Sequence, residues 1–271
     1  MRSKLLCAIA LLGSAAAGAG SAVAADIPVR GAPPAASPAV VAVPEWAGFY
    51  VGANGGGGSA HTSFDQGEFE RITRPSPFDN FNFPGVSSSG GLGGFQWGHN
   101  WQWGQIVGGL EIDFDWSDIK GSSTTAIALP AIPQVTPADP TAFFTQDFKI
   151  EELASARGRL GYLIWPNLLA YGTAGIGWAH TRFTTTEDIP LSRVTARSFE
   201  SNTTFSNEFG WVAGAGLEWK FWNNWFLRGE YLHYEFGKIT HPALGPNEDN
   251  FNLRTRVDIG RAALSYKFGP P

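Results

Sequence analysis

Ionised side chains recur at every second position in several stretches, a spacing suited to ion pairing. Glu111, Asp113 and Asp115 form a row of carboxylates, and Arg157 and Arg159 are also two residues apart. Residues two apart in a strand share a face, so we expect both arginines to meet the carboxylate row. The full set balances five acids with five bases: Glu111, Asp113, Asp115, Arg157, Arg159, Glu218, Lys220, Arg228, Glu230 and Arg261. Balance favours a structural ion-pair network over the alternative, a slow path for ions.

Catalytic and metal chemistry have little support. His180 and His233 fall on the opposite, outward face, but no serine nucleophile with an orienting acid accompanies either; Thr181 and Glu235 are near only in the chain. The five histidines show no metal-ligand spacing. Four glycines at 55–58 lack the Lys-Ser/Thr pair of a phosphate loop. We therefore expect no catalytic residue, no metal and no cofactor.

The elements that carry these charges have the period-two pattern of β-strands. In residues 106–117 one face is apolar and the other carries the three carboxylates. Each alternating segment is about eleven residues long, as a tilted strand needs to cross a bilayer core. The pattern occurs in eight segments, at 47–54, 93–101, 106–117, 154–162, 168–178, 211–221, 227–234 and 262–268.

The alternation leaves two architectures open, which differ in the face turned inward. A secreted sandwich would turn its charges to solvent, whereas a membrane barrel would turn them into a narrow interior and its apolar face to lipid. Connections alternate between tight (102–105, 164–167, 222–224) and long (near 59–88, 119–147, 183–204 and 238–250). That rhythm favours an all-β fold, an eight-stranded antiparallel transmembrane β-barrel with short periplasmic turns and long external loops.

Tryptophans gather at the ends of the expected strands, where membrane interfaces hold amphipathic rings. The alternative is an aromatic core in a soluble domain. The predicted aromatic girdle comprises Trp46, Trp97, Trp101, Trp116, Trp165, Trp178, Trp211, Trp219, Trp222 and Trp225.

Three segments follow from composition. Residues 1–24 read as a cleaved signal peptide, with Arg2 and Lys4 before a short apolar run and a small-residue cleavage site at 22–24. Residues 25–45 read as a Pro/Ala-rich periplasmic linker, or alternatively as a recognition peptide. The barrel itself is expected over 46–268. The only cysteine, Cys7, lies in the predicted leader, and the acidic balance argues against nucleic acid as a partner.

Several runs resemble the small "porin family" or immunogenic-protein barrels of the Gram-negative outer membrane, within the OmpA/OmpX-like eight-stranded superfamily. They are residues 46–54, 98–102, 157–162 and 230–232, together with 26–30 after the leader. Residues 261–268 also resemble the terminal signal read by the barrel-assembly machinery, carried here by Arg261, Tyr266 and Phe268. Ala263 replaces the usual glycine, and Gly269-Pro270-Pro271 follows the terminal aromatic. An ordinary last strand would alternate in the same way.

The resemblance implies an integral outer-membrane protein that contributes to membrane integrity and surface interaction. A narrow low-conductance porin and a lipid-A-modifying enzyme are the alternatives. Expected partners are outer-membrane lipid and lipopolysaccharide, the barrel-assembly machinery with periplasmic chaperones, and an external ligand of the loops. Lys149, Arg182 and Arg254 would contact lipopolysaccharide phosphates. Phenylalanines in the first long loop form an adhesive patch or pack on the barrel mouth.

Overall fold

Nine strands make up the fold of the computed structural model, which describes residues 45–65, 85–128, 141–190, 197–237, 239–241 and 251–269. The strands are β1 (Gly48–Asp65), β2 (Val86–Trp103), β3 (Ile106–Ala128), β4 (Thr141–Trp165), β5 (Leu168–Pro190), β6 (Arg197–Trp222), β7 (Trp225–Phe236), β8 (Ile239–His241) and β9 (Phe251–Lys267). The predicted signal peptide and, except for Glu45, the predicted linker lie outside the described residues. No described helix is long and apolar enough to cross a membrane.

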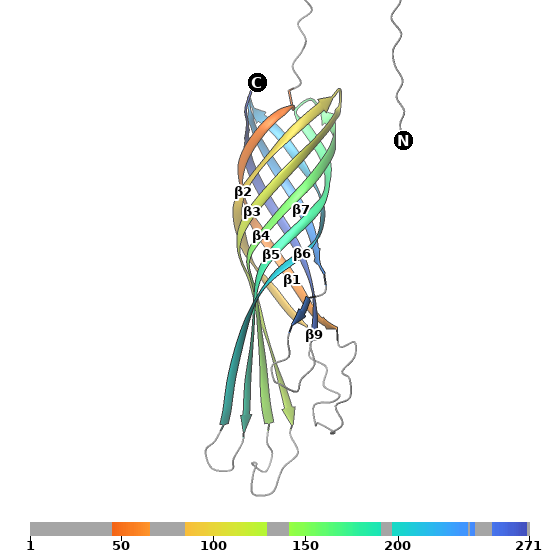
Figure 1. Ribbon diagram of the computed structural model, residues 1–271. Helices are drawn as coiled ribbons and strands as arrows, with labels where there is room; N and C mark the ends of the chain where they lie inside the picture. Colours follow the sequence, from red (N-terminus) through yellow and green to blue (C-terminus); the bar gives the residue numbers. More distant parts are fainter. Residues whose placement is uncertain are drawn as a thin grey trace, which may run out of the picture. The chain divides into compact units, whose positions relative to one another are not determined.

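Eight long strands close into a ring of antiparallel neighbours (Figure 1). Each strand from β1 to β6 pairs with the next, β7 pairs with β9, and β9 returns to β1. The three-residue β8 pairs with β9 beyond the point where β7 ends. The predicted eight-stranded antiparallel barrel is confirmed, and each of the eight alternating segments falls on one strand of the ring, with only Ala47 and Phe268 just outside.

The three tight connections are two-residue turns at Gly104–Gln105, Pro166–Asn167 and Asn223–Asn224. They all join strands at the same end of the ring, which we call the short-turn end. Gly104 and Asn223 have positive φ values of 60° and 41°. Glycine and asparagine tolerate this left-handed region best, so the residue types suit the turns.

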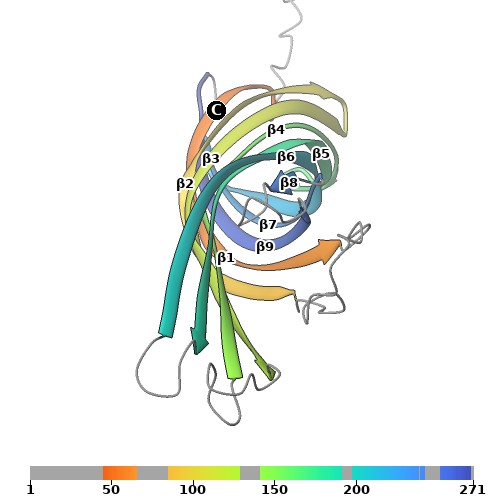
Figure 2. The same cartoon turned by 60° about the horizontal axis from the view of Figure 1, so that its bottom comes forward.

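The strands are longer than predicted at the opposite, long-loop end. Parts of the expected loops, including 119–128, 141–147, 183–190 and 197–204, continue as strand. β3 to β6 leave the ring as a four-stranded ribbon (Figures 1 and 2), which we call the protruding ribbon. Register shifts between Trp116 and Ile119 and between Ile150 and Glu152 mark its base. β-bulges of this kind bend strands.

The interior of the ring is filled in three layers. At the short-turn end lies an aromatic and aliphatic cluster of Trp46, Val107, Leu163, Leu169, Tyr171 and Phe226. The charged residues follow at mid-height. Towards the long-loop end the interior is an apolar core that includes Ile119, Phe148, Ile150, Leu153, Phe183, Leu232, Tyr234, Phe236, Val257 and Ile259.

The apolar face of the predicted segments points outward. Leu110 is 59% exposed and Leu217 is 53% exposed, whereas Glu111 is 3% and Arg159 is 5% exposed. This orientation is that of a membrane barrel rather than a secreted sandwich. One part of the expectation was too simple, because the interior near the long-loop end is apolar too. Ile119 and Phe183 lie in strand extensions that the sequence pattern had left as loops, whereas Leu232 and Tyr234 lie on the inward face of a predicted segment.

Neighbouring strands approach so closely that inward glycines are required at some positions. A Cβ on Gly94 would lie 1.9 Å from the carbonyl oxygen of Phe114 on β3, whereas a Cβ on the outward Gly93 would lie 3.5 Å from its nearest atom, the carbonyl oxygen of Asn54.

We expect Gly94→Ala to lower the free energy of unfolding by about 1–3 kcal/mol, the usual cost of overpacking. Gly93→Ala, its matched control, should change it by less than about 0.5 kcal/mol. Urea titration of the refolded protein in detergent, followed by tryptophan fluorescence, measures both; equal effects would contradict the packing argument.

Candidate functional site: the interior charge cluster

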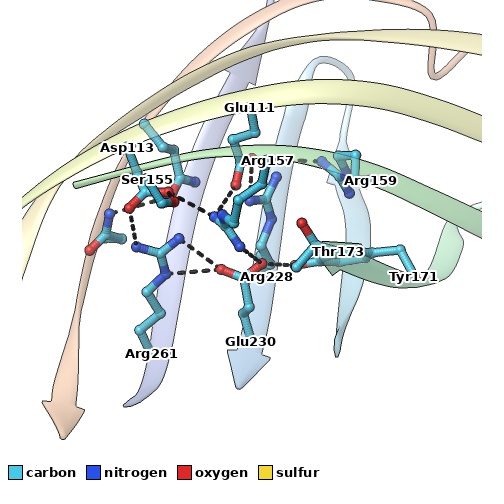
Figure 3. A network of polar contacts seen from close by, with 12 residues as sticks. Glu111, Asp113, Ser155, Arg157, Arg159, Tyr171, Thr173, Arg228, Glu230 and Arg261 are labelled. Carbon is cyan, nitrogen blue, oxygen red and sulfur yellow. Dashed lines mark hydrogen bonds and ion pairs between the residues drawn. The ribbon is translucent and has the colours of Figure 1, made fainter. Parts of the chain in front are cut away.

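Nine of the ten predicted charged residues form one cluster across the barrel interior (Figure 3). Four arginines and five carboxylates take part, all buried. They come from β3, β4, β6, β7 and β9, because alternation along each strand turns these positions inward. The members are Glu111, Asp113, Asp115, Arg157, Arg159, Glu218, Arg228, Glu230 and Arg261.

Arg157 contacts three carboxylates of the cluster. Its Nη2 donates to Glu111 Oε1 at 2.6 Å and to Asp113 Oδ2 at 2.9 Å, both on the neighbouring strand β3. Its Nη1 donates to Glu230 Oε1 on β7 at 3.0 Å. Because β4 and β7 are not neighbours in the ring, this last contact crosses the interior. The expected meeting with the carboxylate row is correct for Arg157.

Arg159 makes its main contacts elsewhere. Its Nη2 donates to Glu218 on β6, and its Nη1 lies 3.9 Å from Glu111, too far for a hydrogen bond. The guanidinium carbon lies 4.2 Å from the ring centroid of Tyr171, within cation–π range. The expectation that Arg159 would join the carboxylate row on β3 therefore holds only at long range.

The other two arginines complete the crossing. Arg228 Nη1 donates to Glu111 Oε2 at 2.5 Å, and its Nη2 donates to Glu218 at 3.3 Å. Arg261 Nη1 donates to Asp115 Oδ2 at 2.8 Å, and its Nε donates to Glu230 Oε2 at 2.9 Å. Each of these two arginines, like Arg157, donates to at least two carboxylates, and Arg159 donates to one. These bonds offset part of the cost of burying the charges.

Lys220 corrects the predicted balance of five acids and five bases. It lies at the short-turn end, and its Nζ pairs with Glu45 at 3.5 Å rather than with the cluster. Its place on β6, two residues from the end of the strand at Trp222, puts it below the cluster on the same inward face. Alternation identifies the face of a residue but not its depth. The cluster therefore has one more carboxylate than arginine.

Three neutral hydroxyls belong to the site and were not singled out from the sequence. Tyr50 donates to Glu111 Oε2 at 2.5 Å, Tyr171 to Glu230 Oε1 at 2.9 Å, and Ser155 to Asp113 Oδ2 at 2.6 Å. They satisfy lone pairs that the arginines leave. The signal was available, because all three alternate onto the charged face of their segments.

The predicted girdle residues point outward with one exception. Trp97, Trp101, Trp116, Trp165, Trp211, Trp219 and Trp222 are exposed on the outer wall, and Trp178 and Trp225 are half-buried. Trp46 was wrongly placed in this girdle, since it is 1% exposed. Its Nε1 donates to the carbonyl of Pro166 at 3.1 Å, and its ring lies 5.0 Å from that of Phe226. It precedes β1 in a turn, where alternation does not apply, and it closes the short-turn end.

The histidines show no complete hydrolytic set in the described part of the chain. His233 Nδ1 lies 2.7 Å from Asp258 Oδ1, a carboxylate that sequence proximity had not suggested. His180 Nδ1 instead lies 3.0 Å from Asn207 Oδ1. His61 Nδ1 lies 3.2 Å from Ser87 Oγ, but no described carboxylate orients that ring. The described residues also hold no cluster of metal-binding type.

Basic residues near the base of the protruding ribbon already have acidic partners. Lys149 pairs with Asp118 at 3.2 Å, and Arg182 pairs with Glu151 at 2.6 Å. Hydrogen bonds from Lys120 and Lys149 lower the pKa of Asp118 below its usual value. Of the residues expected to guide assembly, Tyr266 and Phe268 lie on the outer wall, whereas Arg261 belongs to the cluster.

A closed antiparallel ring with an apolar outer wall and a charged, filled interior defines a transmembrane β-barrel of the outer-membrane type. The chain matches the family "Outer membrane protein beta-barrel domain" over residues 6–268, and it belongs to that family. It is thus an integral protein of the Gram-negative outer membrane.

Curated relatives extend over most of the chain. Over 99% of its length it is 33% identical to the complete "31 kDa outer-membrane immunogenic protein" of Brucella melitensis. It is 30% identical to the "22 kDa outer membrane protein" of Rhizobium leguminosarum bv. viciae, over 70% of this chain and 64% of that protein. Among solved structures, Ail of Yersinia pestis has a TM-score of 0.34 at 11% identity, with 81% of this chain and 99% of Ail covered. The protease OmpT of Escherichia coli has a TM-score of 0.38 at 8% identity, covering 82% and 97%.

Glu111 offers a direct test of the cluster, because one carboxylate receives Arg157, Arg228 and Tyr50. Glu111→Gln should lower the free energy of unfolding by about 3–5 kcal/mol, since buried guanidinium groups lose their counter-charge. The measurement is urea unfolding in detergent. Asp118→Asn removes an exposed carboxylate that also pairs with two cations, and it should leave the unfolding midpoint unchanged. Similar midpoints for the two variants would show that the cluster contributes little.

Proposed function

We propose that this protein is a non-enzymatic, non-conducting structural barrel that strengthens the outer membrane and carries the protruding ribbon at the cell surface. The observation that supports this function is the set of arginine–carboxylate contacts across the interior, especially Arg157 to Glu230 and Arg228 to Glu111. These side chains occupy the middle of the ring. An ion would have to separate buried pairs to pass, at a large cost in free energy.

The layers on either side support the same function. Trp46 and its neighbours close the short-turn end, and the apolar core occupies the interior towards the long-loop end. Small eight-stranded barrels have interiors that side chains just fill. The low-conductance porin is therefore the weaker alternative. The lipid-A-modifying enzyme is also a weaker alternative, because no serine joins the His233–Asp258 pair among the described residues.

Several partners belong to this proposal. Outer-wall tryptophans suit contact with lipid. Lys149 and Arg182 would contact lipopolysaccharide phosphates by exchanging their carboxylate partners for them. The terminal Tyr266 and Phe268 suit binding by the barrel-assembly machinery, and periplasmic chaperones would carry the unfolded chain. Relatives named as immunogenic proteins suit an exposed surface, to which an external ligand of the loops would have access.

Conductance tests the central claim. Purified protein reconstituted in planar bilayers should give no stepwise current, because the charge cluster and the apolar core block the ring. A general porin added to the same bilayer serves as the positive control for insertion and recording. Reproducible single-channel steps that require the folded protein would favour the porin alternative instead.

Accessibility on intact cells tests the orientation. Asp147 lies in the protruding ribbon and Asn167 in a short turn, and both are exposed. Cysteine at Asp147 (Asp147→Cys) should react with a membrane-impermeant maleimide on intact cells. Asn167→Cys should react only after the outer membrane has been permeabilised. The one native cysteine lies in the predicted leader. The reverse labelling pattern would contradict external display of the ribbon.

A further inference from the structure

The protruding ribbon has two free edges in the described part of the chain. β2 and β3 pair as far as Lys120, so residues 121–128 of β3 pair only with β4. β7 and β6 pair from Gly210 onward, so residues 197–208 of β6 pair only with β5. The ribbon thus ends on both sides in strands whose backbone groups are bonded on one side, and Figure 2 shows it apart from the rest of the ring.

The backbone groups that face each free edge can be assigned from neighbouring bonds. Gly237 N donates to Phe209 O on the β7 side, so alternate residues such as Asn207, Phe205 and Thr203 present their N–H and C=O groups to the free side. On β3, Gln105 O accepts from Leu163 N on the β4 side. Odd-numbered residues of β3 point inward both before and after the bulge, so the direction of the backbone groups does not change there. Ser122, Thr124 and Ala126 therefore direct their N–H and C=O groups to the free side.

The central part of each free edge lacks the features that keep strand edges apart, and the charges of the β6 edge, Arg197, Glu200 and Glu208, lie towards its two ends. Natural free edges are usually protected by lysine, proline, bulges or inward charges. Residues 121–128 read Gly-Ser-Ser-Thr-Thr-Ala-Ile-Ala, and residues 201–207 read Ser-Asn-Thr-Thr-Phe-Ser-Asn. Neither contains a charge or a proline, and both contain the threonine and aromatic or β-branched residues that favour strands. Such edges are suited to receive another strand.

We propose that the protruding ribbon joins copies of this chain head to tail, with the free edge of β6 in one copy pairing with the free edge of β3 in the next. All copies in one membrane stand the same way up. β3 runs away from the short-turn end and β6 runs towards it. A β6 edge therefore meets a neighbouring β3 edge antiparallel, the geometry of every ladder in this sheet.

The same direction argument disfavours symmetric pairs. Two copies related by rotation about the membrane normal would bring β6 to β6 in parallel, a slightly less stable arrangement. An extended peptide from another protein would need only one edge, whereas this ribbon has two with matching composition. A head-to-tail contact uses different surfaces on the two copies, so it continues into a ring or a row of barrels.

Proline substitution tests the backbone pairing. Thr203→Pro and Thr124→Pro each remove one N–H directed at a free edge while leaving the bonds to β5 and β4, and proline is tolerated at such positions. Thr203→Ala and Thr124→Ala are matched controls, because they also lose the threonine hydroxyl pairs with Thr184 and Thr145 but keep the N–H. Full-length variants are placed in phosphatidylcholine–phosphatidylglycerol vesicles at low density, and subunits are counted by photobleaching.

The wild type and both alanine variants should form oligomers, and each proline variant alone should be monomeric. A mixture of the two proline variants should form dimers and stop there, because one supplies an intact β3 edge and the other an intact β6 edge. A monomeric wild type, a Thr124→Pro variant that dimerises alone, or equal loss with alanine would each overturn the proposal. Circular dichroism and heat-modifiable migration verify folding, and Ser201→Pro replaces Thr203→Pro should the latter not fold. Conductance and surface labelling do not depend on this association, so its failure is distinguishable from that of the proposed function.

Discussion

The bilayer requires every backbone N–H and C=O group within it to be paired, and the rest of the structure depends on that requirement. A sheet meets it only when its first and last strands join, as β1 and β9 do here. Closing the ring with eight strands leaves an interior too narrow for bulk water, so side chains must fill it. Because side chains alternate along a strand, the register of the strand determines which alternate residues face lipid and which face the interior.

The charge cluster makes a change of strand register costly in free energy. A shift of one residue in β3 would carry Glu111, Asp113 and Asp115 to the hydrocarbon together, and would bring Leu110 and Ile112 inward. Buried ion pairs contribute little net stability compared with apolar packing, but an unpaired buried charge is severely destabilising. The cluster therefore acts mainly by making shifted strand registers unstable. Its contacts between non-neighbouring strands, such as Arg159 to Glu218, also fix how the walls of the ring face each other.

Alternation explains both what the sequence could predict and where prediction failed. It placed Arg157, Arg228 and Glu230 on the inward face correctly, since a period of two needs no knowledge of tertiary structure. Depth along the barrel axis depends on strand tilt and register, so Lys220 was assigned to the wrong layer. Trp46 precedes the first strand, where no period applies. Asp258 meets His233 only through the pairing of β7 with β9, which sequence distance hides. The ribbon was missed because its outward residues, such as Thr124 and Thr203, are polar and do not resemble a lipid-facing row.

In the protruding ribbon, the same strands are surrounded by water instead of lipid. Above the membrane, water satisfies free N–H and C=O groups, so β3 and β6 can continue where β2 and β7 stop, and ring closure is no longer required. Water removes the free-energy penalty of unpaired backbone groups at an open edge, but these groups can still pair with another strand. Charged residues or proline usually prevent such pairing. Neither occurs in residues 121–128 or 201–207. The membrane meanwhile fixes the direction of every copy, so an antiparallel edge contact forms only between unlike edges, and a contact between like edges is parallel and slightly less stable. The constraint that closes the barrel within the bilayer thus also limits how its open part can associate.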